Sequence, residues 1–321
     1  MIMISVAGLI ALVLCLLFGI PYLAFMKKKA YSQYLREEVA QMHAYKEKTP
    51  TTGGVFIIIS IIIASLIALF MAQEVTTGAL IVLTTLIFYT FIGFEDDIMK
   101  IKAHQNLGLS AKGKLLLQIA VALLPALYLI SSGRTEVSFL NYSINLGWFY
   151  PILAMFMMVG ASNAVNLTDG LDGLAASSSV FAFLACAIIC FINNDIDLAI
   201  ISITASASCL GFLYFNKKPA KIFMGDTGSL ALGGLLAAIS IMGKFELWLI
   251  PIAIVFICET LSVMIQVTSF KLTGKRVFKM SPIHHHFELC NWKENKIVTV
   301  FSLITLISCV ISVLVYYFCK A

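Results

Sequence analysis

Long apolar runs fill most of this 321-residue chain, and the charged residues lie mainly in the short breaks between them. Hydrophobic residues make up 60% of the sequence and charged residues only 12%, whereas charged residues are about a quarter of a typical soluble domain. A helix needs about 17–25 apolar residues to cross roughly 30 Å of hydrocarbon. The sequence therefore predicts an all-α polytopic membrane protein that lies in a lipid bilayer.

Ten such runs predict ten transmembrane helices in a single integral membrane domain over residues 1–321. We expect the first run to be retained as a span, because its positive charges follow the apolar segment and no cleavage site of small residues is evident, unlike a signal peptide. Among the outer connections, 132–147 is long enough for a small β-hairpin. The predicted spans are 2–26, 52–73, 76–94, 113–131, 148–165, 173–192, 197–215, 228–243, 246–270 and 297–319.

The basic residues are divided unevenly between the two sides of this arrangement. Only Arg134, Lys244 and Lys320 fall on one side, and the other 19 Lys and Arg residues fall on the opposite side. Because cytoplasmic loops carry an excess of Lys and Arg, the basic side is predicted to be cytoplasmic and both termini extracytoplasmic. The 19 residues lie in the stretches 27–51, 95–114, 216–226 and 271–296.

The same side also carries most of the reactive side chains. Together with a fifth break near 163–172, the four basic stretches contain all five histidines and eleven of the seventeen acids. We therefore expect the active site at the cytoplasmic face.

Three consecutive acids, from Glu95 to Asp97, close the third predicted span, and Lys100 follows. On a helix, adjacent carboxylates point about 100° apart. They can therefore address two partners, such as a hydrated magnesium ion and a reacting phosphate, while Lys100 adds positive charge. The simpler alternative is an i,i+4 ion pair between Asp96 and Lys100 on a solvated helix end.

A polar cluster interrupts the chain between the fifth and sixth predicted spans. Asn163 and Asn166, three residues apart, are expected to share one helix face. Two Asp-Gly pairs, beginning at Asp169 and Asp172, indicate a broken helix whose backbone could approach a ligand closely. A plain turn is the alternative.

Residues 223–229 combine glycines, a carboxylate and hydroxyls directly before the eighth predicted span. This combination at a helix start suits a phosphate and its metal ion. Asp226 could instead be an ordinary helix cap.

Three successive histidines, from His284 to His286, lie in the last basic loop. They cannot all face one metal ion from a regular helix, so a zinc site would need ligands from elsewhere. Imidazole, Lys and Arg donors at this surface better suit a polyanionic substrate.

Two further patterns concern the membrane geometry. Glu259, Ser262 and Gln266 form one polar stripe in the ninth predicted span, which indicates either a cavity or partner for Glu259, or a hydrogen bond between packed helices. Apolar residues at near-helical spacing over 31–45 predict an amphipathic helix at the cytoplasmic interface.

Taken together, these motifs resemble those of the phospho-N-acetylmuramoyl-pentapeptide transferase family, within the polyprenyl-phosphate N-acetylhexosamine-1-phosphate transferase superfamily. The resemblance covers essentially the whole chain, and the string from Pro282 to Glu288 is its most specific mark. The matching segments are Lys46 with 49–54, Asp96-Asp97 with Lys100, 163–174, 224–229 and 282–288.

The resemblance implies a Mg²⁺-dependent reaction in the bacterial plasma membrane, at the first membrane step of peptidoglycan synthesis. Phospho-MurNAc-pentapeptide would pass from UDP-MurNAc-pentapeptide to undecaprenyl phosphate, which gives lipid I and UMP. It also suggests a homodimer and no nucleic-acid partner. A phosphate monoester is mostly dianionic at pH 7, so direct attack on the β-phosphorus is favoured over a covalent two-step route.

The resemblance also suggests roles for individual residues. Asp226 is the expected metal ligand, and the catalytic residues would be Asp96, Asp97, Asp226 and His284. The expected substrate-binding residues are Lys46, Thr51, Lys100, Asn163, Asn166, Asp169, Asp172, Phe223, Gln266, His285 and His286.

Two other functions can be weighed against the same sequence features. A related transferase that takes UDP-GlcNAc would share the aspartate motifs but not the triple-histidine string. An ion-coupled transporter would place several acids through the membrane thickness, whereas only Glu259 lies deep in a predicted span.

Overall fold

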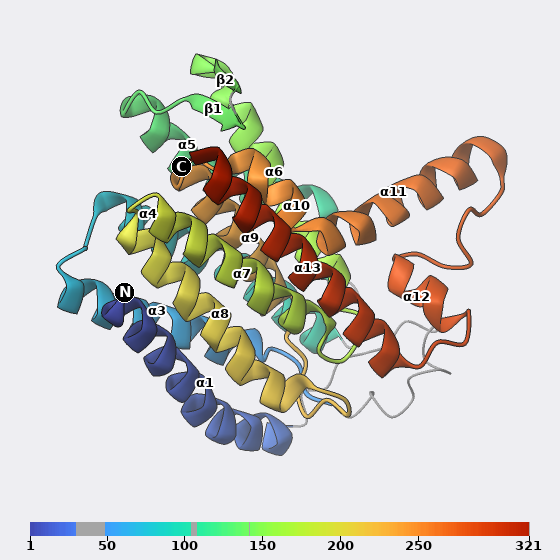
Figure 1. The fold of residues 1–321 in the computed structure, drawn as a ribbon. Helices are drawn as coiled ribbons and strands as arrows, with labels where there is room; N and C mark the ends of the chain where they lie inside the picture. Colours follow the sequence, from blue (N-terminus) through green and yellow to red (C-terminus); the bar gives the residue numbers. More distant parts are fainter. Residues whose placement is uncertain (30–48, 104–107, 141, 321) are drawn as a thin grey trace.

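In the part of the chain that the structure describes, ten helices are long and apolar enough to cross a membrane, and they pack into one bundle (Figure 1). The computed structural model describes residues 1–29, 49–103, 108–140 and 142–320, so the predicted interfacial helix over 31–45 and Lys46 lie outside the described residues. The ten helices confirm the predicted all-α polytopic architecture. They are α1 (Ile2–Lys29), α3 (Gly54–Ala72), α4 (Thr77–Ala103), α5 (Ala111–Ser131), α6 (Tyr150–Thr168), α7 (Leu174–Ile192), α8 (Ile196–Asn216), α9 (Gly225–Met242), α11 (Ile254–Thr273) and α13 (Glu294–Lys320).

Several helices continue past their apolar runs into the polar motifs. α4 extends to Ala103, α6 extends to Thr168, and α9 begins at Gly225. The acids that follow Phe94 and the asparagines of the second motif therefore stand on regular helix. As a consequence, six of the predicted site residues stand on α4, α6 and α9 rather than on loops: Asp96, Asp97, Lys100, Asn163, Asn166 and Asp226.

The prediction of one continuous span over 246–270 is wrong at its beginning. A 3-10 turn η3 (Glu246–Trp248) and a short helix α10 (Leu249–Ile252) precede α11, which begins only at Ile254. Ala253 leaves the helical conformation between α10 and α11, and Pro251 lies in the first turn of α10, where its missing N–H costs no helical hydrogen bond. After this break, α11 leans away from the other long helices (Figure 1).

The loop after α11 returns to the bundle through α12 (Ile283–Glu288), which carries the three histidines. On α11, the buried residues include Glu259, Ser262 and Gln266, so the predicted polar stripe faces protein. The stripe faces the returning loop. Gln266 donates to the Phe278 carbonyl, and Glu259 accepts from the backbone N–H of His284.

The expected hairpin is present between α5 and α6. Strands β1 (Glu136–Phe139) and β2 (Tyr142–Asn145) pair antiparallel, with Val137 opposite Ile144. The 3-10 turn η2 (Gly147–Phe149) leads from the hairpin into α6.

Helix α9 is the centre of the bundle. Every residue from Thr227 to Met242 is buried, and the helix contacts α3, α4, α5, α6, α7 and α8. Lipid offers little hydrophobic drive for helices to associate, so membrane helices depend on close packing of small residues. The neighbours of α9 provide them, since a Cβ on Gly93 of α4 would stand 2.1 Å from the Asp226 carbonyl oxygen, and a Cβ on Gly54 of α3 would stand 2.1 Å from Gly228 N.

Small residues on α8 also pack helices within this one chain. Ser65 of α3 and Thr204 share a hydrogen bond of 2.7 Å, and Ser206 donates to the Val180 carbonyl of α7. The stretch from Ser202 to Ser208 is therefore used inside the protomer, and the homodimer stays a prediction.

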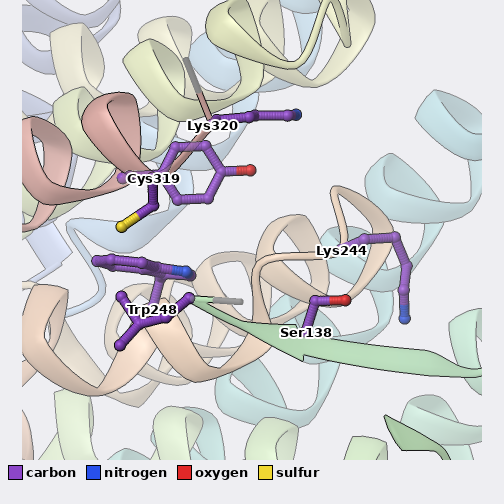
Figure 2. A pocket seen from close by; sticks show the side chains of 7 residues that line it. Ser138, Lys244, Trp248, Cys319 and Lys320 are labelled. Atoms are coloured by element: carbon purple, nitrogen blue, oxygen red, sulfur yellow. The ribbon is translucent and has the colours of Figure 1, made fainter. Parts of the chain in front are cut away.

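The three basic residues of the less charged side gather near the carboxyl end of α9. Arg134 donates to the Met242 carbonyl, Lys244 pairs with the buried Glu246, and Lys320 donates to Asn193. A small pocket between the hairpin and the end of α13 is lined by Lys244, Trp248 and Lys320 (Figure 2). Cations near a helix carboxyl end are stabilising. A structural role therefore accounts for the presence of these three basic residues on the less charged side.

We expect Gly93→Ala to lower the free energy of unfolding by about 1–3 kcal/mol, because the added methyl overpacks the contact between α4 and α9. Gly160→Ala is the matched control, since a Cβ there meets nothing within 4 Å. Thermal melting in detergent measures both, and equal melting temperatures for the two variants would contradict this account of α9.

Candidate active site

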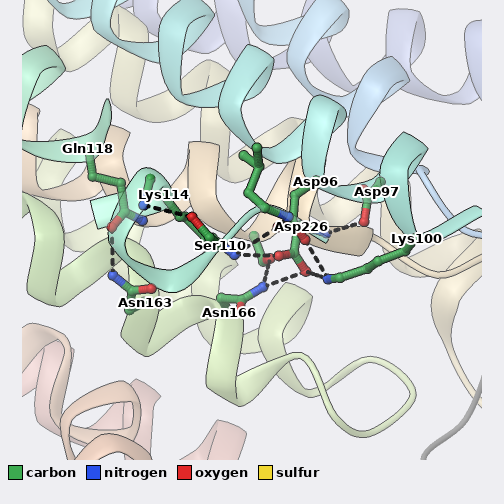
Figure 3. A network of polar contacts seen from close by, with 12 residues as sticks. Asp96, Asp97, Lys100, Ser110, Lys114, Gln118, Asn163, Asn166 and Asp226 are labelled. Atoms are coloured by element: carbon green, nitrogen blue, oxygen red, sulfur yellow. Dashed lines mark hydrogen bonds and ion pairs between the residues drawn. The ribbon is translucent and has the colours of Figure 1, made fainter. Parts of the chain in front are cut away.

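Two acids and two lysines from three helices form the centre of a polar network at the amino end of α9 (Figure 3). Lys100 Nζ lies 2.6 Å from Asp96 Oδ2 and 3.1 Å from Asp226 Oδ1. Lys114 Nζ lies 2.6 Å from Asp226 Oδ2 and 3.9 Å from Asp96 Oδ1. Each ammonium is thus shared by both carboxylates.

The alternative interpretation of Asp96 is correct in one respect and wrong in another. The i,i+4 ion pair with Lys100 exists, but the expected solvated helix end does not, because Asp96 is only 2% exposed. Part of the burial comes from the chain before α5, where Leu109 N donates to Asp96 Oδ1 at 2.9 Å. Asp96 is therefore enclosed by protein on the side of the 108–110 segment.

Asparagine side chains from α6 extend the network, as their spacing predicted. Asn166 Nδ2 donates to Asp226 Oδ1 at 3.0 Å and to Ser229 Oγ at 2.8 Å. Asn163 Nδ2 donates to Gln118 Oε1 at 3.0 Å. Both asparagines therefore face the same cluster from α6.

Asp97 contacts the backbone of α9 rather than the lysine pair. Its Oδ1 accepts from Asp226 N at 3.1 Å, and its Oδ2 accepts from Thr227 N at 2.9 Å and from Thr227 Oγ1 at 2.6 Å. A carboxylate at exposed helix N–H groups caps the helix and complements its dipole. These contacts give Asp97 the task of positioning Asp226, and a direct catalytic role for Asp97 stays a prediction.

Lys114 is the charged residue of this network that sequence reasoning missed. It lies inside the predicted span 113–131, where a lysine is costly unless it faces protein. Gln118 follows at i+4 and is only 1% exposed. A lysine and a glutamine on one face of a membrane helix were the available signal, although the partner of Lys114 could not be read from it.

The segment before α3 lies against the start of α9. Phe223 N donates to the Pro50 carbonyl, and Gly53 N donates to the Phe223 carbonyl, both at 2.8 Å. Thr51 is buried in this pairing, and its hydroxyl would lie 2.9 Å from a Cβ on Gly225. Thr51 and Phe223 are therefore next to the aspartate network, as their predicted roles require.

The break between α6 and α7 separates its two aspartates. Asp169 is the carboxyl cap of α6 and is half-buried. Asp172 is 3% exposed, and its Oδ2 accepts from Ala220 N at 3.0 Å. The backbone N–H of Asp172 donates to Glu294 Oε1, so this residue ties the break to the chain before α9 and to α13.

The three histidines and Gln266 form a neighbouring cluster on α11 and α12. His284 Nδ1 lies 3.1 Å from Glu259 Oε2, and His285 Nδ1 lies 2.7 Å from Glu288 Oε2. His286 Nδ1 accepts from Lys279 N. Gln266 accepts from the backbone N–H groups of Val277 and Phe278 and donates to the Phe278 carbonyl, so its amide holds the returning loop.

One short stretch of chain connects the two clusters. Asn166 bonds Asp226, and four residues later Gly170 lies against His284, where a Cβ on the glycine would stand 2.3 Å from Nε2. The carboxyl end of α6 thus links the aspartate network with the histidine cluster.

Asp96 and Asp226 are the residues of this network that could hold a divalent cation. Among the described residues, no group of three or more His, Cys, Asp or Glu side chains is placed to hold a metal ion. Mg²⁺ does not require one, since it usually binds one or two carboxylates together with substrate phosphates. Asp96, Asp97 and Asp226 against two lysines also leave a formal charge of −1, which a divalent cation would offset.

Comparison with known proteins places this network inside a recognised sequence region. A family model described as glycosyl transferase family 4 matches residues 79–244. The chain is 48% identical over 312 residues to the phospho-N-acetylmuramoyl-pentapeptide-transferase of Oceanobacillus iheyensis, which covers 95% of both proteins. The proteins of the same name from Halalkalibacterium halodurans (49% over 283 residues, 87% of both) and Listeria monocytogenes serotype 4b (46% over 305 residues, 94% of both) are similarly close.

We expect Asp97→Asn to destabilise the protein by about 1–3 kcal/mol, because the amide places a donor where the carboxylate accepts from α9. Glu95→Gln, an exposed neighbour on the same helix, is the control and should melt like the wild type. Thermal melting in detergent checks the pair. An unchanged melting temperature for Asp97→Asn would show that this cap is not needed.

Proposed function

Because this chain belongs to the phospho-N-acetylmuramoyl-pentapeptide transferase family, within glycosyl transferase family 4, we propose that it catalyses that family's transfer. The donor is UDP-MurNAc-pentapeptide and the acceptor is undecaprenyl phosphate. An oxygen of the lipid phosphate attacks the β-phosphorus of the donor and forms a new P–O bond. The bond between the β-phosphorus and the bridging oxygen breaks, and UMP leaves with that oxygen.

The observation that carries the proposal is the pair of ammonium groups shared by two buried carboxylates. Lys100 and Lys114 each contact both Asp96 and Asp226. Two phosphate-bearing substrates repel one another unless their charges are neutralised, and groups already in place for this lower the barrier. The long lysine side chains can turn from the carboxylates to incoming phosphate oxygens without movement of the helices.

The charge asymmetry of the chain supports a cytoplasmic orientation of this network. The network ends of α4, α5 and α9 lie in two of the stretches that carry most of the Lys and Arg residues, 95–114 and 216–226. A soluble nucleotide donor and a lipid acceptor can meet only at a membrane surface. The active site therefore faces the cytoplasm at the plasma membrane, with both termini on the outer side.

Magnesium is the proposed cofactor, held by Asp226 together with Asp96. When bound, it would neutralise phosphate charge and favour departure of UMP. Asn166 donates to the Asp226 carboxylate and to the Ser229 hydroxyl. Ser229 thereby holds the Asn166 amide in place, and Asn166 keeps the Asp226 carboxylate oriented. Asp97 fixes the turn of α9 from which Asp226 projects.

We expect purified protein to release UMP from UDP-MurNAc-pentapeptide when undecaprenyl phosphate and Mg²⁺ are both present. Removal of Mg²⁺ with a chelator should abolish release, and readdition should restore it. UDP-GlcNAc serves as the comparison donor. Release with UDP-GlcNAc alone would favour the related transferase, and no release from either donor by folded protein would refute the proposal.

We expect Lys114→Gln to lower kcat/KM by at least about tenfold, since it removes one of the two charges available to the phosphates. Lys112→Gln is a matched control, because Lys112 is exposed one half-turn earlier on α5. Steady-state UMP release measures both variants. Equal losses for Lys112 and Lys114 would mean that only the general positive charge of this surface matters.

A further inference from the structure

A buried carboxylate on α11 contacts His284 at two points. Glu259 and His284 are 0% and 1% exposed. Glu259 Oε2 lies 3.1 Å from the ring Nδ1 and accepts from the His284 backbone N–H at 3.4 Å. The backbone contact holds the residue in place, and the ring contact opposes rotation of the imidazole.

The other ring nitrogen points toward the break between α6 and α7. Nε2 is so close to Gly170 that a Cβ there would stand 2.3 Å away. Within the described part of the chain, neither ring nitrogen makes a hydrogen bond, and Nδ1 has only its ion-pair contact with Glu259, so Nε2 has no partner of either kind. Gly170 itself is exposed, so Nε2 lies directly beneath the surface at a position where the chain has no side chain.

We propose that Glu259 is a positioning residue for the transfer reaction, which holds the His284 imidazole with Nδ1 toward the carboxylate and Nε2 toward a substrate phosphate. The inference rests on the proposed function. Gly170 completes the arrangement, because any larger residue would occupy the space beside Nε2. Neither Glu259 nor Gly170 needs to touch the substrate for this role.

The chemistry of a carboxylate beside an imidazole explains the role. A carboxylate at Nδ1 favours the proton on that nitrogen and stabilises the imidazolium form, as in hydrolase triads and in the outer shell of metal sites. An imidazole that carries a proton on each ring nitrogen can donate from Nε2 to a phosphate oxygen. A helix of six residues such as α12 could not orient the ring alone.

A double-mutant cycle in UMP release tests the proposal. Glu259→Gln keeps the size of the side chain but removes its charge, and we expect kcat to fall at least about tenfold with KM for the donor changed by less than about threefold. His284→Gln should also lose activity. The double variant should be no slower than His284→Gln alone, because Glu259 acts only through that ring.

Two further variants keep the test independent of folding defects. Gly170→Ala changes no charge and displaces the ring from the other side, so it should also lower kcat and lose its effect in the His284→Gln background. Glu246→Gln is the matched control, since Glu246 is 1% exposed and lies at the other end of α9. It should leave kcat per folded protein unchanged in both backgrounds.

The outcomes separate the two hypotheses. Losses that multiply in the double variant, or full kcat in folded Glu259→Gln, would overturn the positioning role while wild-type UMP release upholds the proposed function. Absence of UMP release by the wild type would overturn the proposed function and this role with it.

Discussion

The Asp97 carboxylate at the amino end of α9 is the contact on which the rest of this structure depends. α9 is enclosed by six other helices, so its first N–H groups cannot be satisfied by bulk water, and a buried donor without a partner is costly. Asp97 accepts from two of them and from the Thr227 hydroxyl. Because Asp226 is the second residue of α9, the contact that completes the helix also sets the position of the acid on which both lysines converge.

The site is built from helix ends that meet because α9 is lined with small residues. Gly54 and Gly93 let α3 and α4 approach the backbone of α9 at its first turn, which brings Asp96 and Lys100 to Asp226. The end of α6 then reaches from Asp226 to His284 within five residues. The same contacts therefore pack the helices of the bundle and position the reactive groups.

Hydropathy predicted the ten spans because the bilayer imposes one length on every crossing. It ended two spans too early and began a third too late, since α4, α6 and α9 keep their hydrogen-bond ladder through polar motifs that hydropathy does not count. The spacing of Asn163 and Asn166 predicted their shared face. It could not show that Lys114 pairs with Asp226, 112 residues away, or that Gln266 holds the backbone of a loop that folds back on it. The break between α10 and α11 was hidden from hydropathy, because the apolar run continues through Ala253.

The sharing of two ammonium groups between Asp96 and Asp226 also makes the binding of two ligands interdependent. Each lysine that turns toward a phosphate leaves a carboxylate with an unpaired negative charge, which is costly in a buried position. A cation that occupies the carboxylates would in turn release the lysines. On the proposed function, each ligand would lower the free-energy cost of admitting the other, and linkage requires such an effect to be equal in both directions. In the absence of both, the two lysines offset Asp96 and Asp226, and the remaining formal charge of −1 belongs to Asp97, which the first turn of α9 holds.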